Sequence, residues 1–113
     1  MEAIDEAQFE QLVGEALDTL PEELGQLLDN VVIMVEDEHP EEDLLGLYEG
    51  LPLTEREFAD VLMPDRITVY RLPLCEESSD IEELRREVTI TVVHEVAHHF
   101  GIDDDALHEL GWG

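Results

Sequence analysis

Apolar residues recur at helical spacing in two stretches of the chain. The first stretch predicts an amphipathic helix over residues 4–19. The second predicts a longer helix from about residue 80 to residue 100, with so wide an apolar arc that we expect it to be mostly buried. The arc consists of Ile81, Leu84, Val88, Ile90, Val92, Val93, Val96, Ala97 and Phe100. The remaining polar stripe of this helix consists of Glu87, Thr91, His94 and His98.

Three shorter segments have the composition of β-strands. Residues 31–35 are apolar throughout and mostly β-branched, which predicts a strand buried on both faces. Residues 44–48 predict a second strand, weakened by Gly46. Residues 66–72 alternate polar and apolar positions, as a half-buried strand does.

Further short helices are predicted from Pro21, over residues 54–60 and over residues 103–110. Together these elements predict an α+β fold, in which a small mixed sheet of about three strands packs against the long helix. The additional helices would surround this pair of layers. The length of 113 residues and the lack of internal repeats predict a single domain over residues 1–113.

Both ends of the long helix carry recognisable signals. At its start, either Ser79 with Glu82 or Asp80 with Glu83 can form a capping box. At its end, Gly101 can adopt the positive φ with which helices commonly terminate. We therefore expect the chain to reverse direction at this glycine.

The charge of the chain is strongly negative. Its 31 acidic and 5 basic residues give a formal net charge of −26. Such a chain repels phosphate backbones and anionic lipids, so we expect neither nucleic acid nor a membrane as partner. The N-terminus does not resemble a signal peptide, no apolar run could span a membrane, and Cys75 is the single cysteine. These features predict a cytoplasmic protein.

The polar stripe of the long helix contains the pattern HExxH. Residues four apart share one helix face, so His94 and His98 can direct both imidazoles at one metal ion. Glu95 lies about 100° further round the helix, where its carboxylate can take a proton from water on that ion. The donor types favour zinc as cofactor and Glu95 as catalytic base.

A catalytic zinc ion needs a third protein ligand and keeps one position for water. Carboxylates that follow the long helix can supply this ligand, and Asp103, Asp104 and Asp105 are all near. One of them, for which we favour Asp103, is expected to cap the terminal helix instead. Glu87 and Glu109 are weaker candidates.

Other imidazole and aromatic side chains could support the site. We expect His99 to pack or to orient a ligand, with stabilisation of the transition state as the alternative. Tyr48 and Tyr70 are expected on the faces of the sheet rather than as oxyanion donors, and His39 in solvent. His108 could approach the ion from the terminal helix.

Residues 94–112 resemble the small bacterial zincin-like metallopeptidase family. The match rests mainly on the pattern HExxHxxGxxD, which begins at His94 and ends at Asp104. The resemblance implies a compact zincin fold in a cytoplasmic bacterial protein. It also implies that His94, His98 and Asp104 hold zinc and that Glu95 is the catalytic base.

Two functions are favoured by these observations. The first is a zinc metallopeptidase for peptides or unfolded segments, basic ones among them, aligned by strand addition at a sheet edge. We favour the strand that contains Tyr70 for this edge. The alternative is a metal-stabilised protein-interaction module with an acidic surface and no turnover. A metal-dependent nuclease is a third hypothesis, which the charge of −26 opposes.

Overall fold

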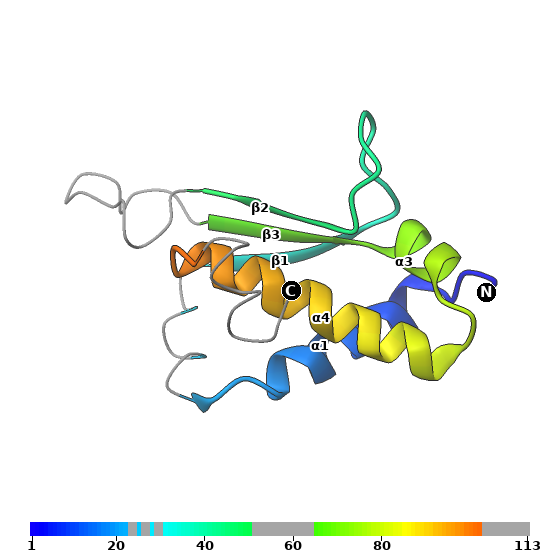
Figure 1. Ribbon diagram of the computed structural model, residues 1–113, viewed down its shortest axis with the longest axis horizontal. Helices are drawn as coiled ribbons and strands as arrows, with labels where there is room; N and C mark the ends of the chain where they lie inside the picture. Colours follow the sequence, from blue (N-terminus) through cyan, green and yellow to red (C-terminus); the bar gives the residue numbers. More distant parts are fainter. Residues whose placement is uncertain (23–24, 26–27, 29–30, 51–64, 103–113) are drawn as a thin grey trace.

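Residues 1–22, 25, 28, 31–50 and 65–102 are described by a computed structural model of the chain (Figure 1). The elements are α1 (Glu6–Asp18), β1 (Val31–Glu36), β2 (Gly46–Glu49), β3 (Asp65–Tyr70), α3 (Arg71–Glu77) and α4 (Ile81–His99). They confirm the predicted α+β class. The helices predicted over 54–60 and 103–110, and half of the segment predicted from Pro21, lie outside the described residues. Among the described helices, none is long and apolar enough to cross a membrane.

The three strands form one mixed sheet in the order β1-β3-β2. β3 runs parallel to β1 and antiparallel to β2, so that Ile67 lies opposite Ile33 on one side and Tyr48 on the other. Every residue of β3 except Arg66 is buried, because strands flank it on both sides and α4 contacts it. The prediction that this strand is only half-buried is therefore wrong. The strand that ends at Tyr70 is the central one, so the hypothesis that it provides the substrate edge is also wrong.

Among the described strands, β1 lies at an edge of the sheet, although its apolar sequence predicts burial on both faces. None of its residues is buried, and Val32 is 44% exposed. The prediction fails because β3, and not β1, occupies the central position that a doubly covered strand needs.

α4 lies between the sheet and α1, with the three layers stacked in the view of Figure 1. The core consists of Phe9, Leu12, Val13 and Ala16 from α1, Ile67 and Val69 from β3, Leu74 and Cys75 from α3, and Leu84, Val88, Val92 and Val96 from α4. Ile90 belongs to the predicted apolar arc but is 44% exposed. It lies about 200° round the helix from both Val88 and Val92, and so faces away from the core.

α4 begins and ends where the sequence predicts. The Asp80 carboxylate accepts the N–H of Glu83 at 2.8 Å, so of the two possible N-caps the structure forms this one. At the other end, Gly101 has φ of 78° and the N–H of Ile102 donates to the carbonyl of Ala97 at 2.9 Å. This is the Schellman arrangement, which satisfies the last carbonyls of the helix and turns the chain back.

A short helix that the sequence analysis did not predict, α3, follows β3 directly. The strand ends at Tyr70, and Arg71 begins the helix. The guanidinium of Arg71 donates to the carbonyl of Ile4 at 2.7 Å and to the carboxylate of Asp37 at 2.8 Å. These partners come from distant parts of the chain. Pro73 in the first turn removes no helical hydrogen bond, and it is the local signal for this helix.

Candidate metal centre

The second half of α4 brings together three side chains with metal-binding atoms. One ligand atom from each of His94, Glu95 and His98 lies within 4.8 Å of the other two. The spacing of four places both histidines on one face, and their rings meet edge to face with centroids 4.6 Å apart. The two predicted ligands and the predicted base are therefore neighbours in the structure.

The spacing of these donors fits a zinc ion. Two atoms that each bind zinc at about 2.1 Å are at most about 4.2 Å apart. Donors within 4.8 Å of one another therefore need only small side-chain movements to share an ion. Imidazole nitrogen and carboxylate oxygen are also donor types that zinc prefers.

Glu95 is buried beside the histidines. It is 7% exposed, whereas His94 and His98 are half-buried. Its carboxylate lies 3.0 Å from Nδ1 of His98. A neutral His98 that donates from Nδ1 to this carboxylate keeps the lone pair of Nε2 for a metal. The contact therefore fixes the orientation of both side chains.

The predicted third ligand, Asp104, lies outside the described residues. The same holds for the alternatives Asp103, Asp105 and Glu109 and for His108. Glu87 is described, but it precedes His94 by two helical turns, which is about 10 Å along the axis. It is not part of the donor group and lines a neighbouring pocket instead.

β2 approaches α4 closely at the glutamate. A Cβ atom on Gly46 would lie 2.7 Å from Cγ2 of Thr91 and 3.3 Å from Oε2 of Glu95, so glycine permits this contact. Tyr48, two residues on and thus on the same strand face, meets His99 with ring centroids 5.8 Å apart. Two strand residues span about 6.6 Å and four helix residues about 6 Å. β2 therefore follows α4 from Glu95 to His99.

A buried polar cluster lies at the end of α4, formed by His99, Asp65 and Tyr48. Nδ1 of His99 lies 2.7 Å from the Asp65 carboxylate, and the Tyr48 hydroxyl donates to the same carboxylate at 2.5 Å. His99 is 2% and Asp65 3% exposed, and Nε2 of His99 has no hydrogen-bond partner among the described residues. His99 and Tyr48 thus pack as expected. Asp65 was missed, because 34 residues separate it from His99.

Tyr70 is buried at the end of β3, where its ring meets that of His39 edge to face with centroids 5.9 Å apart. Burial raises the pKa of Tyr70 above its ordinary value of 10.0, and the carboxylates of Glu36, Glu49 and Glu95 act in the same direction. Its hydroxyl therefore stays protonated at neutral pH and above.

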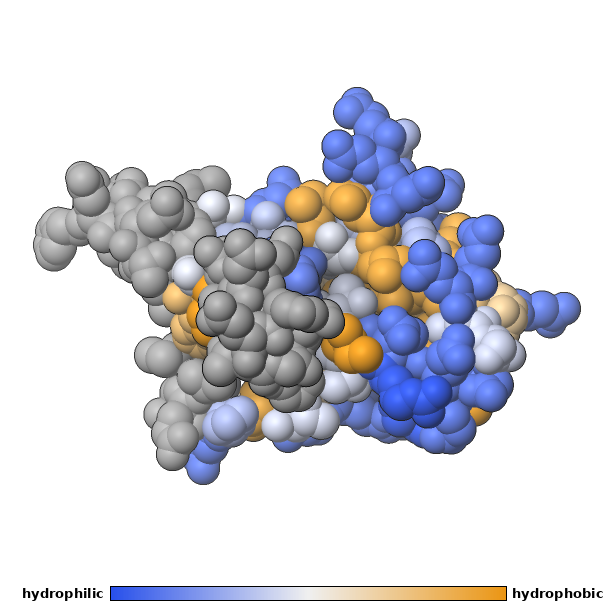
Figure 2. All heavy atoms as spheres, in the orientation of Figure 1, coloured by the Kyte–Doolittle hydropathy of each residue, from blue (hydrophilic) through white to orange (hydrophobic). Residues whose placement is uncertain are grey.

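Two pockets border Leu45. The pocket beside the metal centre has a volume of about 260 Å³ and is lined by Leu45, Gly46, Glu87, Ile90, Thr91, His94 and Glu95. We call it the β2–α4 pocket. Figure 2 shows apolar atoms gathered between the sheet and α4 on this face, with hydrophilic side chains around them. The second, which we call the acidic pocket, has a volume of about 400 Å³ and is lined by Glu38, His39, Glu42, Asp43, Leu45, Pro73, Glu76 and Glu77.

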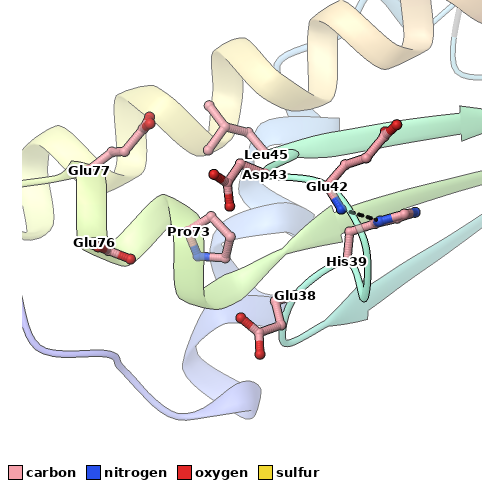
Figure 3. A pocket seen from close by; sticks show the side chains of 8 residues that line it. All are labelled: Glu38, His39, Glu42, Asp43, Leu45, Pro73, Glu76 and Glu77. Carbon is pink, nitrogen blue, oxygen red and sulfur yellow. Dashed lines mark hydrogen bonds between the residues drawn. The ribbon is translucent and has the colours of Figure 1, made fainter.

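His39 lines the acidic pocket (Figure 3). The sequence analysis expected this side chain in solvent, but it is half-buried. Its Nδ1 accepts the backbone N–H groups of Glu41 and Glu42 at 3.1 and 3.0 Å. A neutral imidazole that accepts at Nδ1 carries its hydrogen on Nε2 and has no lone pair left for a metal. Within the described part of the chain, the donor group for a metal is the one on α4.

A long helix that carries an HExxH donor set and packs beneath a small mixed sheet defines a zincin-type domain. Residues 28–112 match the family model described as zincin-like metallopeptidase. The chain therefore belongs to the zincin-like metallopeptidase family. Its fold is similar to that of a conserved hypothetical protein from Thermo thermophilus, with a TM-score of 0.57 and 25% identity over 95% of this chain and 97% of that chain. No curated protein matches it.

Proposed function

We propose that this protein is a zinc-dependent metallopeptidase that hydrolyses peptide bonds with metal-activated water. The observation that carries the proposal is the convergence of His94, Glu95 and His98 on α4, in a chain of the zincin-like metallopeptidase family. His94 and His98 would hold the zinc ion, and the family resemblance adds Asp104 as third ligand.

Glu95 is the proposed general base. Zinc, when bound, lowers the pKa of a coordinated water to about 7 and polarises a substrate carbonyl. The Glu95 carboxylate accepts the proton of the attacking water and returns it to the nitrogen of the leaving amine. Its burial and its contact with Nδ1 of His98 support this role, because they hold the carboxylate at a fixed position beside the ligands.

Peptides or unfolded protein segments are the proposed substrates. Within the described part of the chain, β2 pairs with β3 alone, so its other edge has no strand partner. An extended peptide can add to that edge through main-chain hydrogen bonds and then follows β2 along α4. The net charge of −26 favours peptides with basic residues over nucleic acid or anionic membranes. From the family resemblance we also propose a cytoplasmic, bacterial location.

A second candidate function is a metal-stabilised interaction module without turnover. The observation that favours it is the acidic pocket, whose lining includes five carboxylates and which suits a basic partner (Figure 3). In that case chelation lowers the melting temperature, while no peptide is cleaved.

The test compares His94→Ala with Glu95→Gln. We expect His94→Ala to lose stoichiometric zinc and all hydrolysis, because one of two helical ligands is gone. Glu95→Gln should keep zinc and lose hydrolysis by about 10²- to 10⁴-fold, because the amide cannot accept the proton. Elemental analysis and cleavage of a peptide library measure the two effects.

His39→Ala is the matched control, since it removes a histidine that lies outside the donor group. It should keep the zinc content of the wild type. Hydrolysis by Glu95→Gln at the wild-type rate would contradict the assignment of the base. Zinc binding without any cleavage would favour the interaction module.

A further inference from the structure

We infer that the β2–α4 pocket is the subsite for a large aliphatic side chain of the peptide, next to the bond that is cleaved. This inference rests on the proposed function and adds a substrate class to it. His94 and Glu95 both line the pocket, so whatever occupies it lies directly beside the reacting groups.

Two large aliphatic side chains belong to the lining of the pocket. Leu45 lines one wall, and Ile90 on α4 lines another. Ile90 is 44% exposed, and on an ordinary helix surface such a residue needs no explanation. Here it borders a hollow that also contains Leu45 and the metal-binding face, where an aliphatic ligand would cover it.

Gly46 determines the shape of the pocket. Because it has no side chain, the β2 backbone lies against Thr91 and Glu95 at a distance that a Cβ atom would not allow. The pocket volume of about 260 Å³ is below the range of about 300–1,000 Å³ that is typical of sites for whole small molecules. The space suits one large side chain of a longer ligand.

The edge of β2 explains how a peptide would reach the pocket. Side chains of an extended peptide point alternately to the two faces of the sheet it joins. Gly46 and Tyr48 show which face of β2 is turned toward α4. A peptide added to that edge would direct alternate side chains toward α4, one of them at the pocket. The carboxylates of Glu87 and Glu95 line the same space and oppose an acidic side chain there.

The experiment measures peptide binding by the zinc-loaded Glu95→Gln protein, which is expected to bind without turnover. The probes are peptide pools with mixed flanking residues and one position fixed as Leu, Ala or Asp. We expect the Leu pool to bind roughly 10- to 100-fold more tightly than the Ala pool, because the pocket buries the extra carbons. The Asp pool should bind most weakly.

Ile90→Ala, made in the same background, removes one apolar wall. It should reduce the preference for Leu over Ala several-fold. The matched control is Ile81→Ala, the same substitution on the same helix at a residue that is 41% exposed and does not line the pocket. It should leave the preference unchanged, and thermal unfolding checks that both variants fold.

An unchanged preference in Ile90→Ala, or pools that bind without regard to the fixed residue, would overturn the subsite. A Leu preference that Ile90→Ala removes and Ile81→Ala keeps supports it. If this pattern is found but the wild type cleaves none of the pools, the pocket stands as a binding site for an aliphatic side chain and the peptidase proposal fails. If the wild type cleaves the pools without a preference at the fixed position, the peptidase proposal stands and the subsite fails.

Discussion

Of the side chains that α4 buries from Ile81 to Val92, Thr91 alone is polar, whereas from Glu95 to His99 the buried side chains include a carboxylate and an imidazole. Leu84, Val88 and Val92 are each 0% exposed. In the following turns, Glu95 is 7% and His99 2% exposed. One helix thus has a first half that resembles a protein core and a second half that buries polar groups.

This difference separates the parts of the helix that hold it in place from those that carry chemistry. Burial of apolar surface in the first half stabilises the packing against α1 and the sheet. Burial of polar groups in the second half is unfavourable unless each finds a partner. Glu95 and His99 both have one, in His98 and Asp65 respectively. The first half therefore supplies stability, and the second half supplies orientation.

The largest expected effect on stability is that of Leu84→Ala in the apolar half. Leu84 is completely buried, so its truncation leaves a cavity and should reduce the free energy of unfolding by about 2–5 kcal/mol. Denaturant unfolding measures this loss. Because Leu84 lies far along the helix from the donors, the protein that remains folded should bind zinc with unchanged stoichiometry. Loss of zinc from well-folded Leu84→Ala would contradict the division of α4 into two halves.

A smaller effect is expected for Asp65→Asn, which tests the polar half. In the wild type one carboxylate oxygen, Oδ2 of Asp65, accepts from both Tyr48 and His99. The new amide has nearly the same shape but no charge, so its oxygen is a weaker acceptor for both bonds. The free energy of unfolding should fall by about 1–3 kcal/mol. The matched control is Asp37→Asn, which removes the charge from a partner of Arg71 that is 63% exposed. An exposed pair should contribute at most about 1 kcal/mol. Equal losses in the two variants would show that the buried cluster contributes no more to the free energy of unfolding than an exposed ion pair.

The features of α4 that could be predicted are those determined by neighbouring residues. The apolar period, the Asp80 cap and the Gly101 end are all local, and the structure has each of them. The proximity of His94 and His98 is local as well, since it follows from the helical repeat. For this reason the sequence indicates the candidate site without any knowledge of the sheet.

The features that were missed depend on contacts between distant segments. Sequence alternation describes the polarity of a strand but not its place in a sheet, so the exchange of β1 and β3 as central strand could not be predicted from it. The pairing of Asp65 with His99 has the same origin, since nothing near Asp65 indicates a buried partner 34 residues away. In the sequence, Gly46 looks only like a weak point of its strand. The residue that requires its small size, Thr91, lies on α4 and is distant in the sequence.

The smallest effect is expected for Gly46→Ala, which tests the contact between β2 and the polar half of α4. The new Cβ would lie 2.7 Å from Cγ2 of Thr91, so a side chain or the strand must shift. We expect a loss of about 1–2 kcal/mol in the free energy of unfolding, in the lower part of the range for overpacking, because a terminal methyl group can partly turn away. Since Glu95 is also in contact, the proposed hydrolysis should fall more than this modest loss of stability would suggest.

Two variants give this prediction a control and a rescue. Gly14→Ala makes the same change within α1, where a Cβ meets nothing within 4 Å, and should stabilise the protein by about 0.5–1 kcal/mol through helix propensity. Thr91→Ser removes the methyl group that the new Cβ would meet, and in combination with Gly46→Ala it should restore much of the lost stability. A double variant that is as unstable as the sum of the two single ones would mean that β2 and α4 do not meet at this point. In that case the close approach of the strand could not be what positions Glu95.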